Sequence, residues 1–386
     1  MANRMRFGVF APPFHTQPGL NPSAALHRDV DMIELLDRLG YDEAWVGEHH
    51  SGGAEFISSP EVFLAHVANR TKNIKLGLGV ISLPYHNPLW VAERAIMLDH
   101  LTRGRVILGI GPGSLPTDAA MIGLETSQLR PALEEDAAVL MHLLTSNEPI
   151  SHQTDRYKLV DAMCQLRPYS HPRMEVAAAS AVSPAGARLA GEHGLSLLSI
   201  GATMAAGTDM LAQHWDVVEQ RSAECGTRPN RDGWRLVGPM HLAETREKAY
   251  EEVSFGINSF FDYEQQVVAV PQFALGGTGT EERIDWLNNS GVGVIGTPDD
   301  AIKQIEALEK QSNGGFGCYL MLLPDWVRPS AMRSHLELFA EYVMPHFQGS
   351  RERVAVADQT ARTHRTEMHA KHSDALKQWT EKHRTG

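Results

Sequence analysis

The sequence is short of cysteine, of net positive charge and of long apolar runs, and each shortage excludes a class of protein. Only three of the 386 residues are cysteine, at positions 164, 225 and 318, too few and too scattered for a disulfide framework or a zinc site. The 47 acidic residues outnumber the 35 basic ones and leave a formal charge of −12, so no nucleic-acid binding is expected. No apolar run approaches the roughly 20 residues that cross a bilayer. We therefore expect a cytoplasmic protein that does not contact a membrane.

Short apolar segments alternate with segments in which apolar residues recur at helical spacing. A strand at 6–11, for example, is followed by the helical pattern "SAALHRDVDMIELLDRLG", which ends at Gly40. Eight such strands are expected, at 6–11, 43–47, 74–83, 105–111, 174–180, 195–201, 235–243 and 317–323. This α/β alternation predicts a closed (β/α)8 TIM barrel.

Two segments fall outside the repeat. Residues from about 255 to 291, after the seventh strand, are too long for an ordinary connection and are expected to be a functional insertion or lid within a barrel of residues 1–349. Residues 350–386 contain eight Lys or Arg against five Asp or Glu. They predict a charged helical C-terminal tail, either solvated or packed on a partner subunit in a homo- or hetero-oligomer.

The ends of the expected strands hold few metal ligands. Active residues of a (β/α)8 barrel lie at the carboxyl ends of its strands, and there only the second strand offers a cluster, Glu48, His49 and His50. Adjacent residues on one strand end point in different directions, so a metal centre built on the two histidines is disfavoured. No metal is expected, although a metal-dependent barrel hydrolase stays as an alternative.

Two glycine- and serine-containing turns resemble sites for a nucleotide. "GIGPGS", from Gly109, matches only part of a dinucleotide-binding motif, and its glycines are better explained by close approach of a flat ring to the backbone. In "AASAVSPAG", Ser183 is expected to cap a helix that has Pro184 at its first position. Together with Ser180, this helix start offers free N–H groups that could hold a phosphate.

These segments together have a familiar pattern. "MRFGVF", "GYDEAWVGEHH", "GLGVISLPYHNPLWVAERAIMLDHLTRGRVILGIGPG" and "VAAASAVSPAGARLAGEHG" resemble the bacterial luciferase-like, flavin-dependent monooxygenases over about residues 5–347. The resemblance implies reduced FMN at the strand ends, His49 as the catalytic histidine and a cis peptide between Gly79 and Val80 beneath the ring. It also assigns Ser180 and Ser183 to the phosphate. With the residues that follow the strand ends, the expected cofactor-binding residues are Gly79, Val80, Tyr85, Gly111, Ser180, Ser183, Ser199 and Ile200.

The chain departs from the luciferase pattern after the fourth strand. Luciferase has a reactive cysteine followed by a phosphate-contacting arginine there, whereas this chain has Gly111 and Pro112. Cysteine chemistry is therefore excluded at this position, and Arg130 becomes a candidate cation for the phosphate.

The resemblance, with no NAD site in view, predicts a two-component monooxygenase that uses O2 and receives reduced FMN from a separate flavin reductase. His49 would hold a proton beside the ring, since a histidine titrates near neutral pH. Phe10, Phe14 and Trp90 are expected to form an apolar pocket for a small apolar substrate. Within the family the chain is most similar to terpene-epoxidising members. The alternatives are a deazaflavin-dependent dehydrogenase on the same fold, the metal-dependent hydrolase, and a flavin-binding protein without activity.

Overall fold

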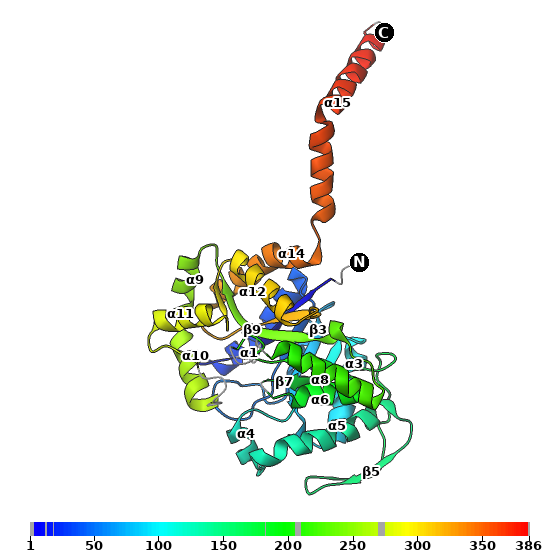
Figure 1. Ribbon diagram of the computed structural model, residues 1–386, viewed down its shortest axis with the longest axis vertical. Coiled ribbons are helices and arrows are strands. Elements are labelled where there is room, and N and C mark those ends of the chain that lie inside the picture. Colours follow the sequence, from blue (N-terminus) through cyan, green and yellow to red (C-terminus); the bar gives the residue numbers. More distant parts are fainter. Residues whose placement is uncertain are drawn as a thin grey trace.

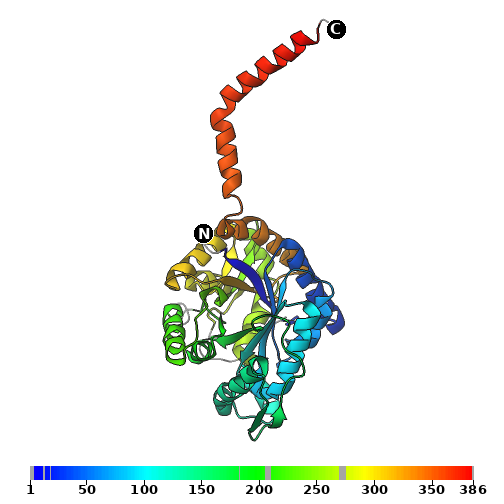
Figure 2. The same ribbon diagram turned by 90° about the vertical axis from the view of Figure 1, so that its right-hand side faces the viewer.

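The molecule is a closed barrel of parallel strands surrounded by helices (Figures 1 and 2). The computed structural model describes residues 4–11, 14–17, 19–181, 183–204, 210–268 and 275–384. The sheet order β9-β11-β1-β2-β3-β4-β7-β8 closes through a β8–β9 pairing. The barrel strands are β1 (Arg6–Ala11), β2 (Glu43–Val46), β3 (Lys75–Ser82), β4 (Val106–Gly111), β7 (Glu175–Ser180), β8 (Ser196–Ser199), β9 (Arg235–Leu242) and β11 (Cys318–Leu322). The eight predicted strands and the (β/α)8 fold are thus confirmed.

The helices begin and end at residues that favour such boundaries. In α1 (Pro22–Leu39) the Asn21 side chain accepts a hydrogen bond from the Ala24 N–H, and Gly40 ends the helix in the left-handed region at φ 84°. The other helices of the barrel are α2 (Pro60–Ala68), α3 (Pro88–Thr102), α4 (Pro116–Met121), α5 (Leu129–Thr145), α6 (Ala185–His193), α8 (Leu211–Cys225), α12 (Pro298–Gln311), α13 (Pro329–Leu338) and α14 (Met344–Gln348). A hairpin of β5 (Ile150–Gln153) and β6 (Lys158–Ala162) follows α5.

Apolar side chains fill the barrel interior, and a second layer packs between the strands and the helices. Phe10, Trp45, Ile107 and Leu320 are buried inside the ring. In contrast, the first residues of the strands carry a buried ion pair, Glu43 on β2 with Arg235 on β9. The amino-terminal end of the barrel is therefore filled by buried side chains, and a site is expected at the carboxyl ends of the strands.

The connection between β9 and β11 holds the expected insertion. It forms α9 (Arg246–Val253), α10 (Ile257–Tyr263), a π-helix (Glu264–Val268), α11 (Thr280–Ser290) and β10 (Val294–Gly296). Residues 269–274, within the expected lid, lie outside the described residues. Apolar residues of this connection pack with Phe14 and Met204 into a separate cluster.

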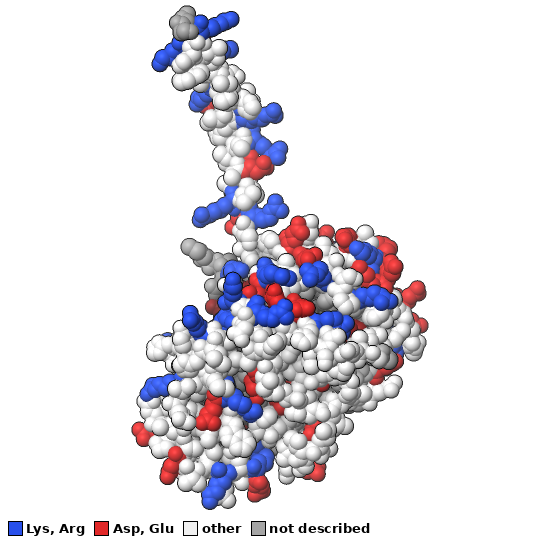
Figure 3. Space-filling view, turned by 180° about the vertical axis from the view of Figure 1, so that it is seen from behind, with Lys and Arg blue, Asp and Glu red and all other residues white. Residues whose placement is uncertain are grey.

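The C-terminal tail is a single long helix, α15 (Glu352–Lys382). It projects away from the barrel (Figures 1 and 2), and each of its residues is exposed. Figure 3 shows basic side chains along it, while acidic and basic side chains are mixed over the body. No helix among the described residues is long and apolar enough to cross a bilayer.

Candidate active site

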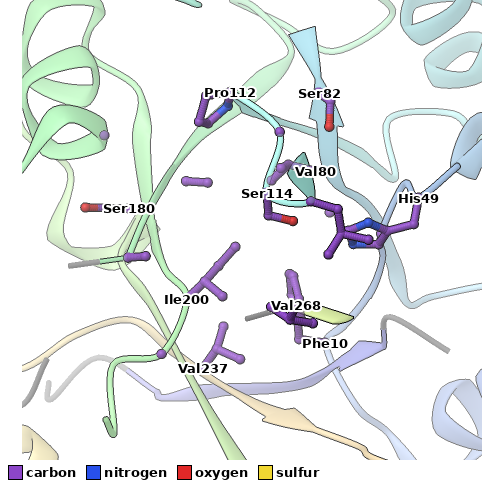
Figure 4. Close-up of a pocket in the computed structure, with 18 of the residues that line it drawn as sticks. Phe10, His49, Val80, Ser82, Pro112, Ser114, Ser180, Ile200, Val237 and Val268 are labelled. Carbon is purple, nitrogen blue, oxygen red and sulfur yellow. The ribbon is translucent and has the colours of Figure 1, made fainter. Parts of the chain in front are cut away.

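A cavity of about 770 Å³ opens at the carboxyl ends of the barrel strands. Its size lies within the range of about 300–1,000 Å³ typical of sites for small ligands. Figure 4 shows His49 and Ser180 on opposite sides of it, with Val80 between them. The other lining side chains are mostly apolar and include Phe10, Phe14, Ile200, Met204, Val237, Phe260, Val268, Leu275, Leu287, Val292 and Leu322.

His49 lies between two carboxyl groups. Its Nδ1 atom is 3.1 Å from Oδ2 of Asp118, at hydrogen-bonding distance. Its Nε2 atom is 3.3 Å from Oε2 of Glu55, close enough for an ion pair although the geometry is not that of a hydrogen bond. The other oxygen of Glu55 accepts a hydrogen bond of 3.1 Å from the Tyr263 hydroxyl. The insertion thus reaches the histidine through Tyr263 and Glu55.

These carboxyl groups determine the protonation of His49. Burial alone would lower the pKa of His49, but Glu55 and Asp118 raise it above its ordinary value of 6.5. Burial raises the pKa of Glu55, against the opposing effect of His49. Burial would also raise the pKa of Asp118, but hydrogen bonds from His49 and Ser51 lower it. His49 is therefore favoured as an imidazolium near neutral pH, with Asp118 as its anionic partner.

Glu48 and His50 have a structural role in the loop that carries His49. Glu48 accepts hydrogen bonds from the Ser82 N–H at 2.8 Å, from His50 at 2.8 Å and from His86 at 2.6 Å. Burial would raise the pKa of Glu48, but these hydrogen bonds lower it to about 2. His50 is thus turned to Glu48, and the pair fixes the loop that carries His49. Among the described residues, no three His, Cys, Asp or Glu side chains are placed to hold a metal ion.

The middle of the cavity is lined in part by backbone. Gly79 and Val80 line it, and the peptide bond between them is cis, as the resemblance predicted. A Cβ atom added at Gly111 would lie 2.7 Å from a methyl group of Val80, so only glycine allows strand β4 to approach here. Tyr85 packs its hydroxyl against Gly113.

The far end of the cavity is polar. The Ser180 hydroxyl donates a 3.0 Å hydrogen bond to the Ser183 carbonyl, and the Ser183 hydroxyl accepts one of 3.3 Å from the Ala185 N–H. Helix α6 begins at Ala185, one residue later than predicted, so Pro184 occupies the cap position and not the first helical position. Arg130, on the first turn of α5, lines the same end.

Four of the expected site residues do not line the cavity: Gly111 and Tyr85, which lie next to the lining residues Val80 and Gly113, and Trp90 and Ser199. Trp90 is 61% exposed on the outer side of α3, where Met97 and Leu101 are exposed as well, so the structure does not place it in this pocket. The Ser199 hydroxyl accepts a 2.9 Å hydrogen bond from the buried Trp234 indole and does not line the cavity. Ile200, which follows the last residue of β8, does line the cavity.

Three acidic residues of the site had no signal in the sequence. Asp118 lies on the short helix α4, Glu55 in the loop after β2 and Glu264 in the insertion. None belongs to a spaced motif, and their proximity to His49 depends on how these connections fold over the barrel. Their position among the loops after barrel strands was the one available indication.

Comparison with known proteins agrees with this geometry. The family model for luciferase-like monooxygenases matches residues 5–312. Limonene 1,2-monooxygenase of Rhodococcus erythropolis is 43% identical over 346 residues, which cover 90% of this chain and 87% of that protein. A 4-hydroxyprotoasukamycin monooxygenase of Streptomyces nodosus subsp. asukaensis is 39% identical over 92% of this chain and 95% of its own length. The oxygenating constituent of 3,6-diketocamphane monooxygenase of Pseudomonas putida, solved with FMN, has a TM-score of 0.73 at 23% identity over 89% and 98% of the two chains.

Proposed function

Because this chain belongs to the luciferase-like monooxygenase family, we propose that it is the oxygenating component of a two-component, FMN-dependent monooxygenase. It would take reduced FMN from a separate flavin reductase and transfer one oxygen atom of O2 to a small apolar substrate. The proposed reaction is epoxidation of a ring alkene in a terpene such as limonene, which the similarity to a limonene 1,2-monooxygenase supports.

The residues that line the cavity support FMN as the cofactor. The backbone at Gly79 and Val80 would lie against the ring, and Ser180 and Ser183, with Arg130 beside them, would bind the phosphate. Reduced FMN, when bound, supplies the electrons that activate O2. The protein holds the cofactor between these two regions and surrounds the reacting end with apolar side chains that exclude water.

His49 is proposed to keep the oxidant protonated. An alkene is electron-rich and accepts oxygen from an electrophilic, protonated oxidant, whereas a ketone in a Baeyer–Villiger insertion needs a nucleophilic, deprotonated one. Asp118 orients the His49 ring through Nδ1 and, with Glu55, favours its protonated form. The position of this histidine between two carboxyl groups, at the edge of an apolar cavity, is the observation that carries the proposal.

The test supplies the purified protein with FMN, NADH, a flavin reductase, O2 and limonene. Limonene 1,2-epoxide, identified by mass spectrometry, is the expected product. If limonene yields no epoxide while a cyclic ketone yields a lactone, the terpene part of the proposal is wrong and the flavin part stands.

A deazaflavin is the alternative cofactor, because several relatives of similar fold are named as F420-dependent. Anaerobic titration separates the two cofactors. We expect reduced FMN to bind and to promote O2 uptake, and F420 not to bind in the same concentration range. Tighter binding of F420 without O2 uptake would contradict the FMN proposal.

A further inference from the structure

The cavity has a second region, beyond Gly79 and Val80, that is built largely by the insertion. Its walls are apolar and come from the strand ends and from the connection between β9 and β11: Phe14, Met204, Phe260, Val268, Leu275, Leu287 and Val292. We call this region the insertion chamber. His49 and Glu55 stand at its border with the rest of the cavity.

One carboxyl group enters this apolar chamber, that of Glu264. It belongs to the π-helix that follows α10, lines the cavity and is half-buried. The ionisable groups that act on this carboxyl group are Glu55 and His49. The carboxyl group forms no hydrogen bond or ion pair with a described residue. The other carboxyl groups of the cavity differ, because Glu48 and Glu55 have partners and Glu134 is exposed.

The oxygens of this carboxyl group are not among the buried side-chain atoms without a partner, so water can reach them in the open chamber. A bound ligand that displaced this water without replacing its hydrogen bonds would lose about 1–3 kcal/mol. A chamber for a pure hydrocarbon would be better lined by leucine at this position. The cost is offset if the ligand itself brings a hydrogen-bonding atom.

We propose that Glu264 is a specificity-determining residue that hydrogen-bonds an oxygen atom of the substrate. The substrate class is then a cyclic alkene that also carries a carbonyl or hydroxyl group, and not a bare hydrocarbon. This inference rests on the proposed function, since it names the substrate class of the same site.

The electrostatic surroundings agree with a donor role. Burial and the nearby Glu55 raise the pKa of Glu264 to about 7, and His49 acts in the opposite direction. The neighbouring Tyr263 hydroxyl is engaged with Glu55 and does not compete for Glu264. Glu264 is thus mostly protonated below about pH 7, and in that form it can donate a hydrogen bond to a carbonyl oxygen.

The test compares two ligands with the same carbon skeleton, limonene and its ketone carvone. Their affinities are measured by titration of the protein with oxidised FMN present, so that no turnover occurs. We expect the protein to prefer carvone at pH 6 by about tenfold, the worth of one well-placed hydrogen bond. This preference should fall at pH 8.5, where the Glu264 carboxylate has lost the proton that a ketone needs.

Three variants assign the effect to Glu264. Glu264→Leu should remove the preference for carvone and keep or improve limonene binding. Glu264→Gln retains an N–H donor and should keep the preference without its pH dependence. Glu281→Leu, which removes an exposed acid of the same insertion, should behave as the unmodified protein. Equal preference in the unmodified protein and in Glu264→Leu would overturn the inference.

Product analysis keeps this inference separate from the proposed function. With reduced FMN and O2, oxygenated product from both ligands without any preference contradicts only the role of Glu264. Absence of oxygenated product from either ligand contradicts the proposed monooxygenase itself.

Discussion

The Nδ1 atom of His49 lies 3.1 Å from Oδ2 of Asp118, which comes from the connection after a different barrel strand. The contact joins the loop after β2 to helix α4 and fixes the ring of the proposed catalytic residue. The two histidines of the "EHH" sequence therefore differ in position. His50 is hydrogen-bonded to Glu48, and of the two only His49 lines the cavity.

Replacement of His49 by alanine should uncouple O2 consumption from product formation. The variant should still bind FMN, since its phosphate end is unchanged, but it should release more hydrogen peroxide and form at least about tenfold less epoxide. The measurement is the ratio of epoxide to O2 consumed. His50→Ala is the matched control and should change this ratio less, and unchanged coupling in His49→Ala would remove His49 from the mechanism.

The pH dependence of coupling should follow His49. Its pKa is raised by Glu55 and Asp118, so the imidazolium is present below this value and is lost as the pH rises through it. In Asp118→Asn one of the charges that raise this pKa is absent, and the pH at which coupling declines should fall. Coupling measured between pH 5.5 and 9 in both proteins tests this, and identical profiles would contradict it.

The sequence predicted the barrel well because each strand and helix has its own local signal. Apolar segments, glycine at helix ends and the alternation of elements depend on neighbours along the chain. His49 and the glycine-lined middle of the cavity were found because they follow strands directly. Asp118, Glu55 and Glu264 were missed since their positions depend on the folding of long connections, and Trp90 was misplaced because its helix turns it outward.

The phosphate end should be sensitive to added negative charge. Ser183→Asp would place a carboxylate at the start of α6 beside the proposed FMN phosphate, and FMN affinity should fall at least about tenfold, or 1.4 kcal/mol. Ser180→Asp should act in the same direction, and Arg130→Ala should weaken FMN more than riboflavin. Equal affinities of the unmodified protein for FMN and riboflavin would exclude a phosphate site.

The tail is proposed to be separate from the barrel of residues 1–349. All of α15 is exposed, and Gly349 leaves the preceding helix in the left-handed region at φ 61°. A chain that ends at Gly349 should therefore unfold within about 2 °C of the full chain and bind FMN equally. Light scattering on both chains reports whether the tail mediates an oligomer, and a large loss of thermal stability would show that it belongs to the folded unit.

The closed end of the barrel should depend on the pair Glu43 and Arg235. Both side chains are 1% exposed, their atoms lie 2.6 and 2.9 Å apart, and the Trp45 indole donates a further hydrogen bond to Glu43. Glu43→Leu would leave a buried guanidinium with Glu175 as its remaining carboxylate, and we expect a loss of about 3–5 kcal/mol in the free energy of unfolding.

The double variant Glu43→Leu/Arg235→Leu shows whether the single variant is unstable because it leaves an unpaired buried charge. It removes both charges, so much of the lost stability should return, because an apolar pair can replace a buried ion pair at little cost.

The same pair should make the protein sensitive to acid. Burial would raise the pKa of Glu43, but Arg235 lowers it from 4.5 to about 2. The contribution of Glu43 is therefore complete above about pH 4.5 and is lost as the pH falls through about 2. Urea unfolding at pH 7 and pH 3 should show this loss in the unmodified protein and a smaller one in the double variant, while equal losses would show that other carboxylates dominate acid unfolding.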